Sequence, residues 1–122
     1  MADHDRIEHD LEDRILDSTI PYDTVETCIE YQVKRKHGEC DVLAVHGKYA
    51  VIVEIKGRDK PKNRTKARHQ LEKDVKWVNL KYPDVTRIFS FYSYTDKSDK
   101  KYRMQWYSDI RWGALRWLFK PF

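Results

Sequence analysis

The sequence has few cysteines and no long apolar run. Its two cysteines, Cys28 and Cys40, are too few for a four-cysteine zinc cage and do not form a C-x-x-C pair. We therefore expect both to be small buried residues in a reducing compartment. No apolar stretch approaches the roughly 20 residues that a bilayer span needs, and the N-terminus lacks the pattern of a secretory signal. These absences favour a soluble intracellular (cytoplasmic) protein without a membrane partner.

Charge is what the sequence has in abundance. Charged residues make up 36% of the 122 residues and hydrophobic residues 40%, which suffices for the core of one domain. The net charge of +4 is uneven, because residues 1–31 hold ten acids and two bases, which leaves +12 for the remainder. A basic body of this kind favours an anionic partner, with nucleic acid ahead of a membrane surface.

Hydrophobic periodicity predicts an alternating series of helices and strands. Between them we expect turns at 37–38 and 46–48, and a basic loop over 57–63 that Pro61 interrupts. The expected elements are a helix over 3–16, strands over 24–34, 41–45 and 49–56, a helix over 65–81, strands over 85–94 and 102–107, and a helix over 108–119. This order predicts an α/β fold, a single domain over 1–122 with one mixed sheet and flanking helices.

Three charged residues at the ends of two neighbouring strands form the candidate active site. Asp41 lies early in the second strand, and Glu54 and Lys56 share one face at the end of the third. Asp41 and Glu54 can supply carboxylates to a hard cation such as Mg²⁺ or Mn²⁺, with the backbone carbonyl of Ile55 as a third ligand. Lys56 can position the attacking water and offset charge on the transition state. The combination favours metal-assisted phosphodiester hydrolysis.

The PD-(D/E)XK nuclease superfamily has a core that this sequence resembles. The likeness lies in Gly38-Glu39-Cys40-Asp41, the thirteen-residue step to Glu54, and Glu54-Ile55-Lys56 before a basic loop. It implies a restriction-endonuclease-like α-β-β-β-α-β core, followed here by a C-terminal strand and helix. Archaeal-type Holliday junction resolvases are closest in size and in the aspartate-to-glutamate step. Cys40 replaces the family's proline, which leaves the carboxylate of Asp41 in place.

The resemblance also implies a glutamate on the first helix that completes the metal site. Glu8 is followed by the apolar Leu11 and Ile15 at +3 and +7, which fits that pattern. Glu12 stays the alternative. Glu39 alternates to the other strand face from Asp41 and is not assigned to the metal.

The second helix carries a further group that the resemblance implies. Gln70 matches the position from which many family members direct a glutamine or lysine towards the site. An exposed helix residue without a role in the site is the alternative. Lys73 and Asp74 stand in the region where recombination-type exonucleases have a tyrosine, which weakens an exonuclease assignment. The implied catalytic set is Glu8, Asp41, Glu54, Lys56 and Gln70, and the implied metal ligands are Asp41, Glu54, Ile55 and Glu8.

The segment after the third strand is rich in bases. Residues 56–81 hold ten lysines and arginines against three acids, which favours phosphate contacts beside the catalytic strand. A solvated basic loop is the alternative. The candidate nucleic-acid-binding residues are Arg58, Lys60, Lys62, Arg64, Lys66 and Arg68.

The C-terminal segment is rich in aromatic residues. Three tryptophans and two phenylalanines within 104–122 favour a role in the core or a dimer interface over base stacking. A homodimer would suit two-strand cleavage, because each subunit has one site.

These features favour a metal-dependent DNA nuclease, an endonuclease with structure selectivity like the junction resolvases. We expect its cofactor to be Mg²⁺ or Mn²⁺ and its substrate to be DNA, and we expect no small-molecule cofactor. Two alternatives stay open. The first is a non-catalytic nucleic-acid-binding module of the same fold, against which the intact Asp41, Glu54 and Lys56 argue. The second is a viral-type RNA endonuclease with a metal-binding histidine, for which the spacing of His4 and His9 gives little support.

Overall fold

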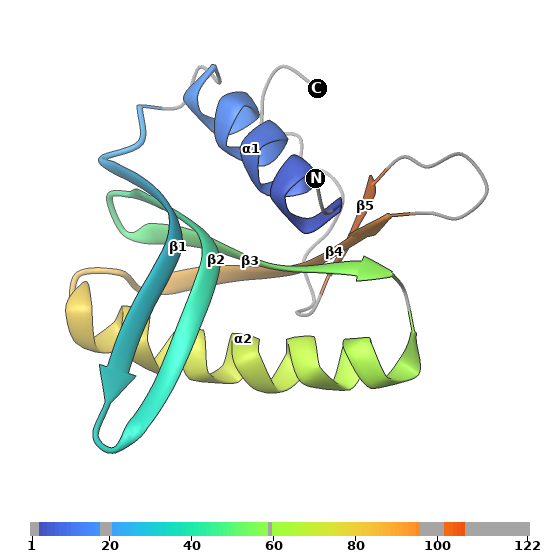
Figure 1. Ribbon diagram of the computed structural model, residues 1–122. Helices are drawn as coiled ribbons and strands as arrows, with labels where there is room; N and C mark the ends of the chain where they lie inside the picture. The colour runs from blue at the N-terminus through green and yellow to red at the C-terminus, as the bar shows by residue number, and fades with distance from the viewer. Residues whose placement is uncertain (1–2, 18–20, 59, 96–101, 107–122) are drawn as a thin grey trace.

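Two helices cover opposite faces of one mixed β-sheet in the computed structural model (Figure 1). The structure describes residues 3–17, 21–58, 60–95 and 102–106. The elements are α1 (Asp3–Leu16), β1 (Thr24–Val33), β2 (Lys36–His46), β3 (Tyr49–Arg58), α2 (Pro61–Lys81), β4 (Arg87–Thr95) and β5 (Tyr102–Trp106). The predicted α/β class and the element order through β5 are confirmed. The helix expected over 108–119 lies outside the described residues.

The strands lie side by side in chain order, from β1 at one edge to β5 at the other. β1, β2 and β3 form an antiparallel meander. β4 then pairs with β3 in parallel, and α2 supplies the crossover that a parallel pair requires. β5 returns antiparallel to β4.

Apolar residues fill one layer on each side of the sheet. On the α1 side, Ile7, Leu11 and Ile15 are buried against alternate residues of β2, β3 and β4, as their helical spacing predicts. On the α2 side, Leu71 and Val78 pack over the other set of strand residues. The central strands are therefore apolar on both faces. Neither described helix combines the length and the apolar character that crossing a bilayer takes.

The second helix begins earlier than the sequence predicts. α2 starts at Pro61, with Lys60 as an N-cap residue in extended conformation. Proline is favoured at the first helical position, because its missing N–H has no partner there and its φ already suits the helix. The expected loop over 57–63 is therefore short: Arg58 ends β3, Lys60 is the N-cap residue and Lys62 lies on α2.

The β1–β2 hairpin also turns earlier than predicted. Val33 pairs with Lys36, and Lys34 adopts the left-handed backbone conformation with φ 57°. Gly38, expected in the turn, lies within β2 opposite Tyr31. A Cβ atom on Gly38 would overlap the ring of Tyr31. This glycine therefore makes room for an aromatic ring on the neighbouring strand.

Candidate active site

The pairing of β2 with β3 stops where the charged residues begin. Its last pair at this end is Val42 with Val53, and Asp41 and Glu54 follow one residue further along each strand. Asp41 is joined to β3 in another way, because its Oδ2 accepts a hydrogen bond of 2.8 Å from the Ile55 N–H. The two carboxyl side chains are 5% and 3% exposed. The strand ends therefore form a fork with two nearly buried carboxyl groups.

The backbone is irregular on both sides of this fork. In β1, Cys28 has φ 51°, which is uncommon for a non-glycine residue, and the pairing with β2 passes over it at the position opposite Asp41. In β3, the register with β4 shifts between Ile55 and Arg58. Bulges redirect side chains and are frequent beside active sites. The irregularities therefore flank the residues that the sequence singles out.

A pocket of about 570 Å³ opens between the fork and α2. Lys56 is half-buried in its wall, on the same side of β3 as Glu54. The structure thus brings four of the five predicted catalytic side chains to one pocket. Its lining residues are Glu39, Asp41, Glu54, Ile55 and Lys56 from the strands and Lys66, His69, Gln70 and Lys73 from α2.

Asp74 of α2 is a buried carboxyl group that the sequence reading did not assign to the site. It is fully buried, and one of its oxygens lies within 4.8 Å of a carboxyl oxygen of Glu54. Burial, reinforced by Asp74 and Asp41, raises the pKa of Glu54 well above its usual range. Burial also raises the pKa of Asp74. Two carboxyl groups this close need a shared proton or a cation between them.

Gln70 contacts Asp74 at the pocket wall. Its Nε2 donates to Asp74 Oδ1 at 3.0 Å and to the Glu39 carbonyl at 2.7 Å. The Tyr31 hydroxyl donates to the same oxygen of Asp74. In this arrangement Gln70 orients a buried carboxylate, in addition to lining the pocket where the resemblance places it.

The expected alternation of strand faces fails at Asp41. Cys40 packs in the layer under α2, whereas Val42 packs in the layer under α1, although a regular strand would put both on one face. Glu39 lines the pocket together with Asp41. The expectation that Glu39 alternates away from Asp41 was wrong in its premise, because residues two apart on a regular strand share a face.

Glu8 approaches the fork from the α1 side. Its side chain is 5% exposed, and its two carboxyl oxygens accept hydrogen bonds of 3.0 and 3.1 Å from Cys28 Sγ. This hydrogen bond, with burial and nearby negative charge, raises the pKa of Cys28 to about 12. Cys28 is exposed, so the expectation that both cysteines are buried is right for Cys40 alone. Glu12 is half-buried, and Glu8 is the more enclosed of the two candidates.

The predicted basic residues divide between two flanks of α2. Lys66 lines the pocket, and His69 and Lys73 follow it at +3 and +7 on the same flank. Arg68 lies about 200° around the helix from Lys66, because each residue adds about 100°. Lys60, Lys62, Arg64, Lys66 and Arg68 are all exposed, and the side chain of Arg58 lies outside the described residues. The helical spacing of 66, 69 and 73 is the signal that would have identified His69 and Lys73.

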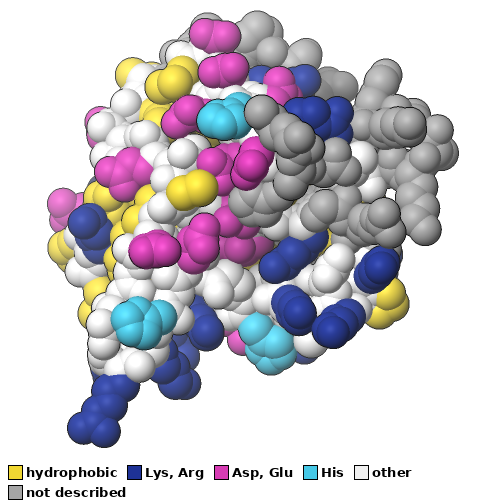
Figure 2. Space-filling model, in the orientation of Figure 1, with side chains coloured by type: hydrophobic (Ala, Val, Ile, Leu, Met, Phe, Trp, Pro, Cys, Tyr) yellow, Lys and Arg dark blue, Asp and Glu magenta, His cyan; other side chains and the backbone are white. Residues whose placement is uncertain are grey.

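Charge is unevenly distributed over the surface near the site. Figure 2 shows acidic side chains over α1 and the middle of the face, with lysines and arginines gathered over α2. His9 is exposed on α1 and is not among the residues that line the pocket, whereas His69 is. The side chain of His4 lies outside the described residues. A polyanion would therefore meet its favourable charges along α2.

The carboxyl groups fit a divalent cation. Within the described part of the chain, Glu54 Oε1 and Asp74 Oδ2 are buried without a hydrogen-bond partner. Native proteins rarely leave such oxygens unsatisfied, and oxygen ligands are what hard cations prefer. No protein-family model, curated protein or solved structure matches this chain. The geometry of the site is therefore the basis for assigning a function.

Proposed function

We propose that this protein is a divalent-metal-dependent nuclease of the PD-(D/E)XK type, an endonuclease that hydrolyses phosphodiester bonds in DNA. The observation that carries the proposal is the convergence of Asp41, Glu54 and Lys56 on one pocket where β2 and β3 separate. The order α1-β1-β2-β3-α2-β4 accords with the restriction-endonuclease-like core that the sequence resembles.

The pocket residues have separate tasks in this proposal. Asp41 and Glu54, with the Ile55 carbonyl, would hold Mg²⁺ or Mn²⁺, and Glu8 would support them from α1. A bound cation of this kind polarises the phosphate and lowers the pKa of a coordinated water. The Ile55 N–H fixes the orientation of Asp41. Lys56 orients the attacking water and offsets the negative charge that develops on the phosphate.

The pocket flank of α2 provides the contacts to the DNA backbone. Lys66, His69 and Lys73 line the pocket, and the two lysines bring positive charge to its mouth. Phosphate contacts of this kind position a nucleic acid without reading its sequence. The substrate would therefore run along α2, with the scissile phosphate at the fork.

The double variant Lys66→Ala/Lys73→Ala is expected to weaken DNA binding more than Arg64→Ala/Arg68→Ala. Both remove two positive charges from exposed positions of α2, but the two pairs lie on different flanks. Loss of two phosphate contacts should lower the slope of log K against log salt by about 2. Fluorescence anisotropy at several salt concentrations measures this slope. Equal losses in the two variants would mean that the pocket flank has no special part in binding.

Asp41→Ala is expected to abolish cleavage and to preserve DNA binding. Removing a ligand and charge from the fork should lower the metal-dependent rate by at least about 10²-fold. Asp41→Asn keeps an acceptor for the Ile55 N–H, and Asp84→Ala changes an exposed aspartate outside the pocket. Cleavage and anisotropy measured on the same samples separate chemistry from binding. Full cleavage by Asp41→Asn and Asp41→Ala would refute the assigned role.

The homodimer stays a prediction. It was based on the aromatic residues within 104–122, whose side chains lie outside the described residues. A dimer would place two forks on one duplex, one for each strand.

A further inference from the structure

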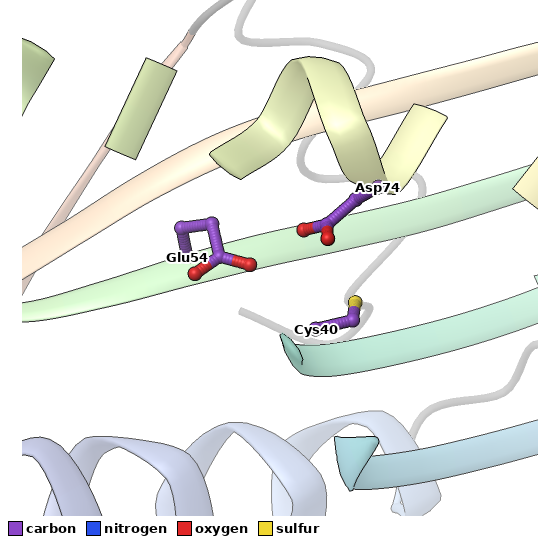
Figure 3. Close-up of side chains that lie close together, drawn as sticks. All are labelled: Cys40, Glu54 and Asp74. Atoms are coloured by element: carbon purple, nitrogen blue, oxygen red, sulfur yellow. The ribbon is translucent and has the colours of Figure 1, made fainter. Parts of the chain in front are cut away.

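Three buried side chains behind the pocket turn their polar atoms towards one another (Figure 3). Cys40 comes from β2, Glu54 from β3 and Asp74 from α2. The Cys40 Sγ and one carboxyl oxygen from each of the other two all lie within 4.8 Å of one another. Their exposed fractions are 0%, 3% and 0%. We refer to this group as the Cys40–Glu54–Asp74 cluster.

Asp74 is held so that one of its oxygens is left for the cluster. Oδ1 accepts hydrogen bonds from Tyr31 and Gln70, whereas Oδ2 is buried and has no partner among the described residues. Glu54 Oε1 is likewise buried and has no hydrogen-bond partner among the described residues. Hydrogen bonds to one side of a carboxylate orient the ligands of metal sites in this way. Two neighbouring buried carboxyl groups beside a sulfur atom therefore each carry one unsatisfied oxygen.

We propose that the Cys40–Glu54–Asp74 cluster binds a borderline-soft divalent cation of the Zn²⁺ class. A thiolate selects such cations over Mg²⁺, which prefers oxygen ligands and water. Two ligand atoms of one tetrahedral zinc ion lie roughly 3.5 Å apart, so atoms within 4.8 Å of one another need to move together by at most about 1 Å. Three protein ligands leave a fourth position open towards the pocket, which Glu54 lines.

This position differs from the proposed Asp41 site in two of its three residues, and it does not depend on nuclease activity. Asp41 is not a member of the cluster, and its Oδ2 is engaged by the Ile55 N–H. Glu54 is the shared residue between the two. A protein without any nuclease activity would still bind the cation at this cluster.

Binding requires a proton to leave the thiol. The Cys40 Sγ donates to the Val42 carbonyl at 3.3 Å in the metal-free protein. When the metal–sulfur bond forms, the S–H bond breaks and its proton passes to the buffer. A proton shared by Glu54 and Asp74 would be released in the same step. Without a cation, that shared proton is the alternative way to satisfy the carboxyl pair.

Cadmium is the probe that reports a thiolate ligand directly. Titrating the full chain with Cd²⁺ should produce a saturable sulfur-to-cadmium absorption in the ultraviolet, with one equivalent bound. Excess Mg²⁺ should not displace it, and Zn²⁺ should. The chain has two cysteines, so Cys28→Ala is a matched control for Cys40→Ala. The absorption should disappear in Cys40→Ala and persist in Cys28→Ala.

A second variant keeps the test decisive if Cys40→Ala does not fold. Asp74→Asn retains the shape and an acceptor for Tyr31, and it should weaken Cd²⁺ binding by at least about tenfold. Circular dichroism and thermal melting establish that each variant is folded. Absorption that depends on Cys28 would place the ion beside Glu8 and overturn the proposal. Unchanged affinity in Asp74→Asn, or no absorption in the unmodified protein, would also overturn it and favour the shared proton.

Discussion

Lys56→Ala is expected to lower the single-turnover rate of metal-dependent DNA cleavage by about 10²- to 10³-fold. Lys56 is half-buried and lines the pocket with both carboxyl groups of the fork, so water screens its charge only in part. In the proposed mechanism its removal takes away the cation that orients water and offsets charge on the phosphate. The affinity for DNA should stay within about threefold, because the proposed backbone contacts come from several other bases.

Lys48→Ala provides the matched control for this rate. Lys48 is an exposed lysine in the turn between β2 and β3, outside the pocket lining. Quenched-flow cleavage of a labelled substrate at saturating protein measures both variants. Equal rates for Lys56→Ala and Lys48→Ala would remove Lys56 from the mechanism.

Glu54→Gln is expected to stabilise the metal-free protein at neutral pH and to flatten the pH dependence of its stability. Burial raises the pKa of Glu54 in the folded state above its ordinary value of 4.5. The unfolded chain therefore loses this proton first as the pH rises. The contribution of Glu54 to the free energy of unfolding is fully present below about pH 4.5. Above that pH it falls by up to about 1.4 kcal/mol per pH unit, until the folded carboxyl group also ionises. Glutamine has no such proton to lose.

Urea unfolding between pH 5 and pH 8 measures this effect. Glu30→Gln changes an exposed glutamate of β1 and serves as the control. The slope of unfolding free energy against pH should decrease for Glu54→Gln alone. Some slope should remain, because burial also raises the pKa of Asp74. Parallel curves for the unmodified protein and Glu54→Gln would show that Glu54 is ionised in the folded state.

The fold was predictable where local patterns decide it. The spacing of Ile7, Leu11 and Ile15 predicted α1, and the apolar runs of β2 and β3 predicted the central strands. Burial of a helix or strand leaves a recognisable pattern of apolar residues along the sequence. The sequence predicts Gly38 in a turn and Pro61 in a loop, because glycine and proline often interrupt strands and helices. In the structure Gly38 makes room for the ring of Tyr31, and Pro61 begins α2. Tertiary packing determines which role applies.

Local patterns likewise identify some residues of the candidate site and miss others. Asp41, Glu54 and Lys56 could be found because strand geometry relates near neighbours along the chain. Asp74 could not, because its link to Tyr31 spans 43 residues and depends on where α2 lies over the sheet. These long-range contacts define the part of the site that the structure adds.

The central claim is tested most directly by incubating the unmodified protein with a panel of labelled nucleic acids. The panel holds linear duplex, single-stranded, flap and four-way-junction DNA, with matched RNA, in Mg²⁺ or Mn²⁺. We expect cleavage of at least one DNA, which stops on chelation and resumes when metal is restored. Tight binding without cleavage of any substrate would contradict a nuclease and leave a binding module, and cleavage of RNA alone would contradict the DNA assignment.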